Sequence, residues 1–468
     1  MNKIYLFLLL TSALLFSQKG NINIDPTFAN NGTAQIFSGS GSLHKNIDDS
    51  FFVMYQTGYF PLSYNIRKFN PQGQIDSSFG NSGEISTQNS VQESFKIDSN
   101  GYIYLFENVL NTQDWYLIRY TPTGIIDVNF GNQGKVLISS NLRYGKVEFY
   151  QNKIYVNLLD VNNKKTKIYR FDNAGTPDTS FGQDGNLTVD YALTYIKIVN
   201  NKILGVAPTV FNDFSLIVQY NLDGTKDTTF GNNGEFSIDN EFYLSSGNVL
   251  SIDPDGKINL FFSKSGNNGY DVKKLIRLNS NGSPDTSFND NGSYIYTSPN
   301  VYYSNSFLTS NKEIYLVGMG NGAYVSRINS SGVDTTFNQN GAKREPSFNI
   351  FYYCFAQSNN RLICLGVVPG NDGNSKLSII GYVGDNRLNV KDTTKSNFQL
   401  YPNPTTDFLM LTELNDSKFS VKITDASGRT VKNINNSKKI DVKNLLSGTY
   451  YIEVITSKNI IKKSFIKK

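Results

Sequence analysis

The chain has 468 residues, of which 39% are hydrophobic and 18% charged, and its formal net charge is +5. Its 32 Phe, 29 Tyr and 38 Gly favour strands and tight turns over helices. One histidine, His44, and two cysteines, Cys354 and Cys364, exclude His-rich zinc sites, Cys-rich metal clusters and disulfide scaffolds. We therefore expect an all-β protein with no metal site and no cofactor.

Residues 1–17 have the order of a secretory signal peptide. Lys3 is followed by apolar stretches at 4–10 and 13–16 and by the small residue Ser17. A membrane anchor is the alternative, but the apolar segment is shorter than the roughly 20 residues that span a bilayer. No later segment is long enough either, so we expect an exported mature chain without a transmembrane segment.

An octet of the form Asp, any residue, Ser or Thr, Phe, three residues and Gly occurs seven times, with some variation at its third position. Successive octets start 49 to 58 residues apart. A period near 50 with short alternating strands predicts propeller blades of about four strands each. The repeated positions are Asp25, Phe28 and Gly32; Asp76, Phe79 and Gly83; Asp127, Phe130 and Gly134; Asp178, Phe181 and Gly185; Asp227, Phe230 and Gly234; Asp285, Phe288 and Gly292; and Asp334, Phe337 and Gly341.

The octet is interpreted as a structural repeat motif that joins the third strand of a blade to the fourth. Its Asp can accept hydrogen bonds from backbone amides two residues on, its Phe can fill the seam between sheets, and its Gly can adopt a positive φ. Seven calcium ligands are the alternative. Calcium needs several oxygens converging on one point, however, and only one carboxylate recurs per octet.

The two ends of the repeat array complement each other. Residues 33–37 follow the first octet with no blade before them, whereas the last interval supplies strands near 350–355, 362–367 and 377–382 with no octet after them. Pairing the first segment with the last sheet would remove an open edge. The predicted fold is a seven-bladed β-propeller over residues 21–383 with N-terminal strand closure.

These octets, together with the segments Leu-Ile-Arg-Tyr at 117–120 and Leu-Ile-Arg-Leu at 275–278, resemble the delta-60 repeat family, a predicted propeller family. The resemblance covers all seven units. It implies the fold, and it supplies no catalytic, cofactor-binding or metal-binding residues.

The composition changes after the repeats. Residues 384–397 are polar and are interpreted as a linker, and residues 398–468 form a second β-rich unit with 12 Lys and Arg against 6 Asp and Glu, a net charge of +6. The preceding 397 residues carry a net charge of −1. Because the basic balance belongs to the tail of an exported chain, we expect no nucleic-acid partner.

The tail resembles the type A sorting domain of the type IX secretion system. The resemblance rests on 400–404 (Leu-Tyr-Pro-Asn-Pro), 421–425, 427–429, 440–442, 445–452 and 463–468. It implies export across the outer membrane by the type IX machinery, then release or surface attachment, often with removal of the tail. Prolines that stiffen the entry and glycines at turns also suit a small antiparallel sandwich, so an ordinary accessory sandwich is the alternative. The sorting motif comprises Tyr401, Pro402, Asn403, Pro404, Gly428, Gly448, Lys467 and Lys468.

Few residues offer chemistry. His44 has no nucleophile motif around it, so we predict no catalytic residue there. If Asn359-Asn360 forms a two-residue turn, as Asn200-Asn201 does in an earlier unit, Cys354 and Cys364 face opposite sides of the sheet and cannot bond; a three-residue turn reverses this.

The sequence favours a non-enzymatic binding or adhesion module for a glycan or a protein. The longest interval carries an extension at 263–270 that suits a projecting binding loop. A polysaccharide hydrolase or lyase that uses two carboxylates is the alternative. A structural surface-layer component is a third possibility.

Overall fold

The computed structural model describes the chain except residues 1–20, 38–40, 58–62, 88–89, 92–94, 109–111, 113, 140–142, 209–214, 240, 245–249, 266–270, 298–300, 310–312, 339, 371–373, 385–398, 413–418, 426–428 and 457–459. The predicted signal peptide and nearly all of the predicted linker thus lie outside the described residues. Every regular element among those described is a β-strand, and they include no helix that could cross a membrane. The chain divides into two compact units, residues 1–386 and 387–468.

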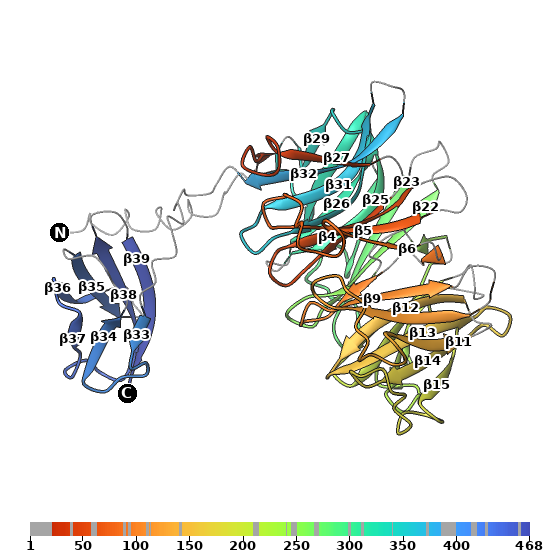
Figure 1. Ribbon diagram of the computed structural model, residues 1–468, viewed down its shortest axis with the longest axis horizontal. Coiled ribbons are helices and arrows are strands. Elements are labelled where there is room, and N and C mark those ends of the chain that lie inside the picture. Colours follow the sequence, from red (N-terminus) through yellow and green to blue (C-terminus); the bar gives the residue numbers. More distant parts are fainter. Residues whose placement is uncertain are drawn as a thin grey trace, which may run out of the picture. The chain divides into compact units, whose positions relative to one another are not determined.

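Five antiparallel sheets of four or five strands follow one another along the first unit (Figure 1). They are β3 (Gly41–Lys45), β4 (Phe51–Thr57), β5 (Ser63–Phe69) and β6 (Glu84–Thr87); β7 (Ser90–Val91), β8 (Lys96–Ile97), β9 (Ile103–Asn108), β10 (Trp115–Tyr120) and β11 (Lys135–Ser139); β12 (Arg143–Tyr150), β13 (Lys153–Asp160), β14 (Lys165–Phe171) and β15 (Asn186–Asp190); β16 (Tyr195–Val199), β17 (Lys202–Ala207), β18 (Ser215–Asn221) and β19 (Glu235–Ile238); and β20 (Tyr243–Leu244), β21 (Leu250–Ile252), β22 (Ile258–Ser265), β23 (Asp271–Leu278) and β24 (Ser293–Thr297).

A ten-stranded sheet completes this unit. It contains β25 (Tyr302–Leu308), β26 (Ile314–Gly320), β27 (Gly322–Asn329), β28 (Gly332–Val333), β29 (Ala342–Glu345), β30 (Ile350–Ala356), β31 (Leu362–Pro369), β32 (Ser375–Gly384), β1 (Ile22–Ile24) and β2 (Thr33–Phe37). As paired strands, the groups β25–β29 and β30–β32 meet at a single position, where Met319 lies opposite Ile350. Each group therefore has its own hairpins and resembles one of the smaller sheets.

The predicted pairing of the N-terminal segment with the last sheet is confirmed. β1 and β2 both pair antiparallel with β32, and Thr33 lies opposite Ile380. Figure 1 shows these red strands beside the blue β32. The last sheet also contacts the first one, since Lys45 donates a hydrogen bond to the carbonyl of Ala356 and the Gln357 amide donates one to Pro71. Both ends of the array therefore meet.

Apolar clusters fill the seams between neighbouring sheets. In one cluster, Phe106 of β9 and Leu117 of β10 pack with Val147 of β12 and Val156 of β13. The first strands of adjacent sheets contact each other across these seams, as β12 does with β16 and β3 with β30. We call the strand that directly precedes and pairs with the first long strand of each sheet or group the inner strand; these are β3, β8, β12, β16, β21, β25 and β30.

The second unit contains two antiparallel sheets. One comprises β33 (Gln399–Tyr401), β34 (Phe408–Thr412) and β37 (Lys439–Asp441), and the other β36 (Thr430–Asn435), β35 (Phe419–Asp425), β38 (Gly448–Thr456) and β39 (Ile460–Lys467). Leu409 and Leu411 of the first sheet share one core with Val421 and Ile452 of the second. The alternation of buried and exposed residues along these strands follows from one face of each sheet lying on that core.

Candidate functional site

The repeated octets fold as turns that are closed by the aspartate. In all seven, the Asp side chain accepts a hydrogen bond from the backbone amide two residues on, at 2.9 to 3.3 Å. Each octet ends on a glycine with φ between +83° and +97°, a conformation that side chains rarely adopt. A methyl group on Gly134 would lie 2.2 Å from the Ile126 side chain. Both the positive φ and the short distance to the Ile126 side chain therefore require glycine at position 134.

The second oxygen of each aspartate pairs with a cation, a feature that the sequence alone did not indicate. Asp127 lies 2.7 Å from Arg119, and Arg119 also lies over the Phe130 ring, 4.5 Å from its centroid. Each octet carboxylate is balanced in this way, which leaves it poorly suited to bind calcium. The seven pairs are Asp25–Arg361, Asp76–Lys68, Asp127–Arg119, Asp178–Arg170, Asp227–Lys202, Asp285–Arg277 and Asp334–Arg327.

The octet phenylalanines lie in the seams between sheets. All seven are at most 2% exposed. Phe79 packs beneath a turn of the next sheet, where a methyl group on Gly124 would lie 2.9 Å from its ring. The amide of Gly80 donates a hydrogen bond to the carbonyl of Thr123 at 2.7 Å. Phe130 and Phe230 have the same relation to the sheets that follow them.

His44 lies in a polar cluster on the inner strands of four consecutive sheets. Its position opposite Phe52 on β4 corresponds to that of Lys96 opposite Tyr104, Glu148 opposite Tyr155 and Lys197 opposite Leu204. The Glu148 carboxylate accepts hydrogen bonds from Lys96 and Lys197, both at 3.0 Å. Lys146, also on β12, lies over the Tyr195 ring, 4.0 Å from its centroid. We call His44, Lys96, Lys146, Glu148 and Lys197 the inner-strand cluster.

Electrostatics fix the charge states of the inner-strand cluster. Burial, with repulsion from Lys96 and Lys146, lowers the pKa of His44 to about 3, so this imidazole is neutral at physiological pH. Burial alone would raise the pKa of Glu148, but attraction to Lys96 and Lys197 outweighs it and holds that pKa below its usual value. The Ser42 hydroxyl lies 2.8 Å from Nε2 of His44.

The inner-strand cluster has no sequence motif of its own, because each of its register-matched residues comes from a different repeat unit. Its four register-matched members lie 30 to 32 residues before the Asp of the octet that ends their unit. Aligning the units on their octets would have placed these residues together. No group of three or more His, Cys, Asp or Glu that could hold a metal occurs in the described part of the chain.

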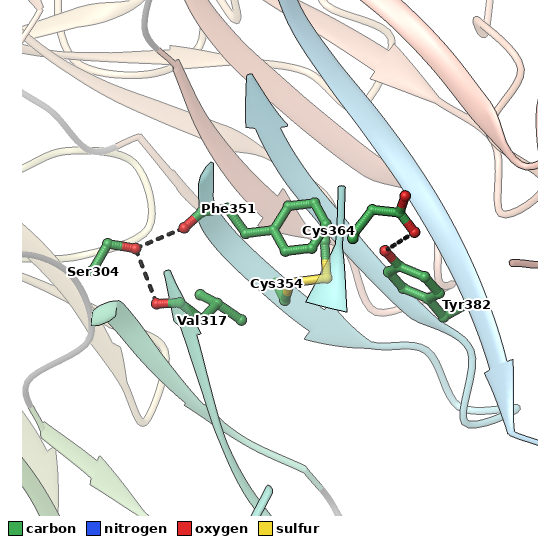
Figure 2. The surroundings of a disulfide bond; sticks show 7 residues. Ser304, Val317, Phe351, Cys354, Cys364 and Tyr382 are labelled. Carbon is green, nitrogen blue, oxygen red and sulfur yellow. Dashed lines mark hydrogen bonds between the residues drawn. A yellow bond between two sulfur atoms is a disulfide. The ribbon is translucent and has the colours of Figure 1, made fainter. Parts of the chain in front are cut away.

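Cys354 and Cys364 form a disulfide bond between β30 and β31, so the preferred prediction that they face opposite sides is wrong (Figure 2). The turn between these strands contains three residues, because the Gln357 amide donates to the Arg361 carbonyl at 2.8 Å. Asn360 ends this turn with φ at +63°. The cysteines are therefore direct cross-strand partners. The comparison turn at Asn200-Asn201 does contain two residues.

The disulfide lies beside the junction of the two groups in the ten-stranded sheet. The Ser304 hydroxyl donates hydrogen bonds to the carbonyls of Val317 and Phe351, as the dashed lines in Figure 2 show. Tyr382 donates to Glu345 at 3.3 Å. Cys354 and Cys364 are buried in the apolar cluster that these strands share.

In the second unit, the motif residues Tyr401 to Pro404 lie at the end of β33, and Lys467 and Lys468 lie at the end of β39. Asn403 accepts a hydrogen bond from the amide of Ile466, and the amide of Thr405 donates to the Ile466 carbonyl at 2.8 Å. These contacts tie the entry of the unit, including Pro402 and Pro404, to its last strand. Tyr401 and Lys468 are exposed, and Lys467 is buried.

The two motif glycines have different positions. Gly448 is the first residue of β38 and lies opposite Lys467, rather than within the preceding turn. Gly428 falls outside the described residues. The predicted loop extension at 263–270 is likewise described only in part: Ser265 ends β22 and pairs with Asp271, and 266–270 lie outside.

Two protein families match parts of the chain, one in each unit. Residues 399–468 match the secretion system C-terminal sorting domain, and residues 254–288, from the turn before β22 to Phe288, match the β-propeller domain of unknown function DUF5122. No curated protein matches the chain.

Several solved structures are similar to the chain at low identity. PorZ, a surface component of the type IX secretion system of Porphyromonas gingivalis, has 12% identity and a TM-score of 0.38; the match covers 91% of this chain and 59% of PorZ. The β-propeller domain of the trilobed protease from Pyrococcus furiosus has 10% identity and a TM-score of 0.44, with 75% and 98% covered. The polysaccharide lyase Uly1 has 10% identity and a TM-score of 0.43, with 76% and 92% covered. Similarities at this level assign neither a ligand nor an activity.

The chain is therefore an all-β protein that combines propeller-type repeats with a type IX sorting tail. The tail directs export by type IX secretion to the cell surface or the extracellular space, and it implies an interaction with the secretion machinery.

Proposed function

We propose that the first unit is a non-enzymatic recognition propeller that acts outside the cell. The observation that carries this proposal is the inner-strand cluster, which collects polar side chains from four consecutive sheets. Lys96 and Lys197 keep 33% and 34% of their side chains exposed, so a ligand in solution can reach them. The octet carboxylates, by contrast, are all engaged in ion pairs that hold turns together.

The proposal includes a finer description of the fold. The ten-stranded sheet counts as two blades, since its halves pair as strands at only one position. The first unit then has seven blades over residues 21–383. The tail at 398–468 is an antiparallel sandwich, supported by the core that its two sheets share. Residues 1–17 serve as the signal peptide and 384–397 as the linker. The octets serve the fold, and Tyr401 to Pro404 shape the entry to the sorting unit.

Binding and turnover can be measured together. The exported protein is screened on an array of glycans and extracellular-matrix proteins, and the same polysaccharides are assayed for new reducing ends and for the unsaturated products of a lyase. Saturable binding without product is the expected result. Product formation would contradict the proposal and favour a polysaccharide hydrolase or lyase. Self-association with no ligand would favour a structural surface component.

A further inference from the structure

The inner-strand cluster carries more positive than negative charge. Lys96 and Lys197 share one carboxylate, that of Glu148, and Lys146 is a third cation of the cluster. With His44 neutral, three lysines and one glutamate give a net charge of +2.

The two lysines that share Glu148 are close enough to repel each other. Burial and repulsion from Lys96 lower the pKa of Lys197 even though Glu148 opposes both effects. Placing like charges together in a partly desolvated position costs free energy unless a counter-charge balances them. An anion in contact with both ammonium groups would supply that counter-charge, and each ammonium group offers several hydrogen-bond donors.

We propose that the inner-strand cluster binds the acidic group, a carboxylate or a sulfate, of an extracellular saccharide. This inference rests on the proposed recognition function and names its ligand class. Lys96 and Lys197 contact the anionic group, and Lys146 adds to the local positive potential.

The charge outside the cluster makes this attraction local. Residues 21–383 contain 27 Lys and Arg against 31 Asp and Glu, a net charge of −4, so the propeller as a whole does not attract polyanions. Affinity for an acidic saccharide should therefore depend on a few lysines and weaken as salt concentration rises.

The test compares charge changes within and outside the cluster in the exported protein. The probes are an oligogalacturonate, a sulfated oligosaccharide, a neutral oligosaccharide of equal length, and sodium sulfate, titrated by calorimetry. The double variant Lys96→Gln/Lys197→Gln should weaken binding of an acidic oligosaccharide about tenfold or more. Lys165→Gln, a matched change on β14 outside the cluster, should leave binding unchanged. Lys96→Arg, which keeps the charge, should retain most of the affinity.

Glu148→Gln separates a binding role from a purely structural one. If the cluster only stabilises the fold, removing either sign of charge should be harmful. If it binds an anion, removing the competing carboxylate should tighten binding, and this is the result that we expect. Circular dichroism and thermal unfolding show which variants remain folded, and the Lys96→Arg and Glu148→Gln comparisons keep the test valid if the double variant unfolds.

Any one of four outcomes would overturn the proposal. The first is that the wild-type protein binds no acidic oligosaccharide, even if it binds free sulfate. The second is equal affinity in wild type and in a folded Lys96→Gln/Lys197→Gln variant. The third is weaker binding in Glu148→Gln. Binding of the neutral oligosaccharide with no effect of any cluster variant would refute this site and leave the recognition function standing, whereas a failure of the whole glycan and matrix screen would refute the recognition function itself.

Discussion

Each octet aspartate serves two partners at once, which explains why the repeat conserves its spacing along this chain. One oxygen closes the turn and the other pairs with a Lys or Arg, which lies on a strand in six octets and directly before β31 in the first. Burial alone would raise the pKa of Asp285, but hydrogen bonds from Ser287 and pairing with Lys257 and Arg277 outweigh it and lower the pKa to about 2. The pKa values of Asp25, Asp76, Asp178, Asp227 and Asp334 are lowered as well.

These shifts predict acid sensitivity. A carboxyl group whose pKa is lower in the folded state binds more protons when unfolded, so its contribution to stability is present above pH about 4 and is lost as pH falls toward 2. His44, with its pKa lowered to about 3, acts in the same direction between about pH 6.5 and 3. Thermal unfolding followed from pH 7 to 2 should show both losses.

The variant Asp285→Asn isolates one carboxylate. It should reduce the drop in unfolding free energy between pH 4 and 2 while leaving the part between pH 6.5 and 4 as in wild type. Identical pH profiles for the two proteins would contradict the role assigned to this ion pair.

The octet phenylalanines stabilise the seams between neighbouring sheets by apolar packing. Phe130 is fully buried, and its replacement by Ala should lower the unfolding free energy by about 3 to 5 kcal/mol. Val128, two residues earlier in the same octet, is 59% exposed. The variant Val128→Ala should therefore change the unfolding free energy by less than about 0.5 kcal/mol. Denaturant unfolding of both variants checks this, and similar losses at the two positions would refute the seam packing.

At the level of elements, turn length decides which side chains meet. The sequence predicted the strands of the last unit well: 350–355, 362–367 and 377–382 fall within β30, β31 and β32. It did not predict the register of the hairpin β30–β31. Two consecutive asparagines, here Asn359 and Asn360, can form a two-residue turn by themselves or the last two positions of a three-residue turn. Only the closing bond between Gln357 and Arg361 distinguishes the two.

The hairpin disulfide has a measurable consequence. Mass spectrometry of the exported protein without reductant should show Cys354 and Cys364 linked, whereas free thiols at both positions would contradict the pairing. The bond closes a short loop, since the cysteines are 10 residues apart. On a chain-entropy estimate, the double variant Cys354→Ala/Cys364→Ala should lose roughly 2 to 3 kcal/mol of unfolding free energy.

At the level of the whole molecule, closure and export were both readable from sequence. The unpaired segment 33–37 and the incomplete last unit predicted the pairing of β2 with β32, because an exposed sheet edge is unfavourable. The inner-strand cluster was not predicted, since its residues come from four units and carry no motif of their own. Sequence periodicity thus identifies the elements, whereas side chains gathered from separate units are found only when register is known.

Export by the C-terminal unit is the central claim, and cell fractionation tests it most directly. The full chain and a chain that ends at residue 398 are produced in a bacterium with a type IX secretion system, and each is followed in periplasm, on the cell surface and in the medium. The full chain should be outside the outer membrane, and the shortened chain should accumulate in the periplasm. Equal export of the two chains would contradict the account.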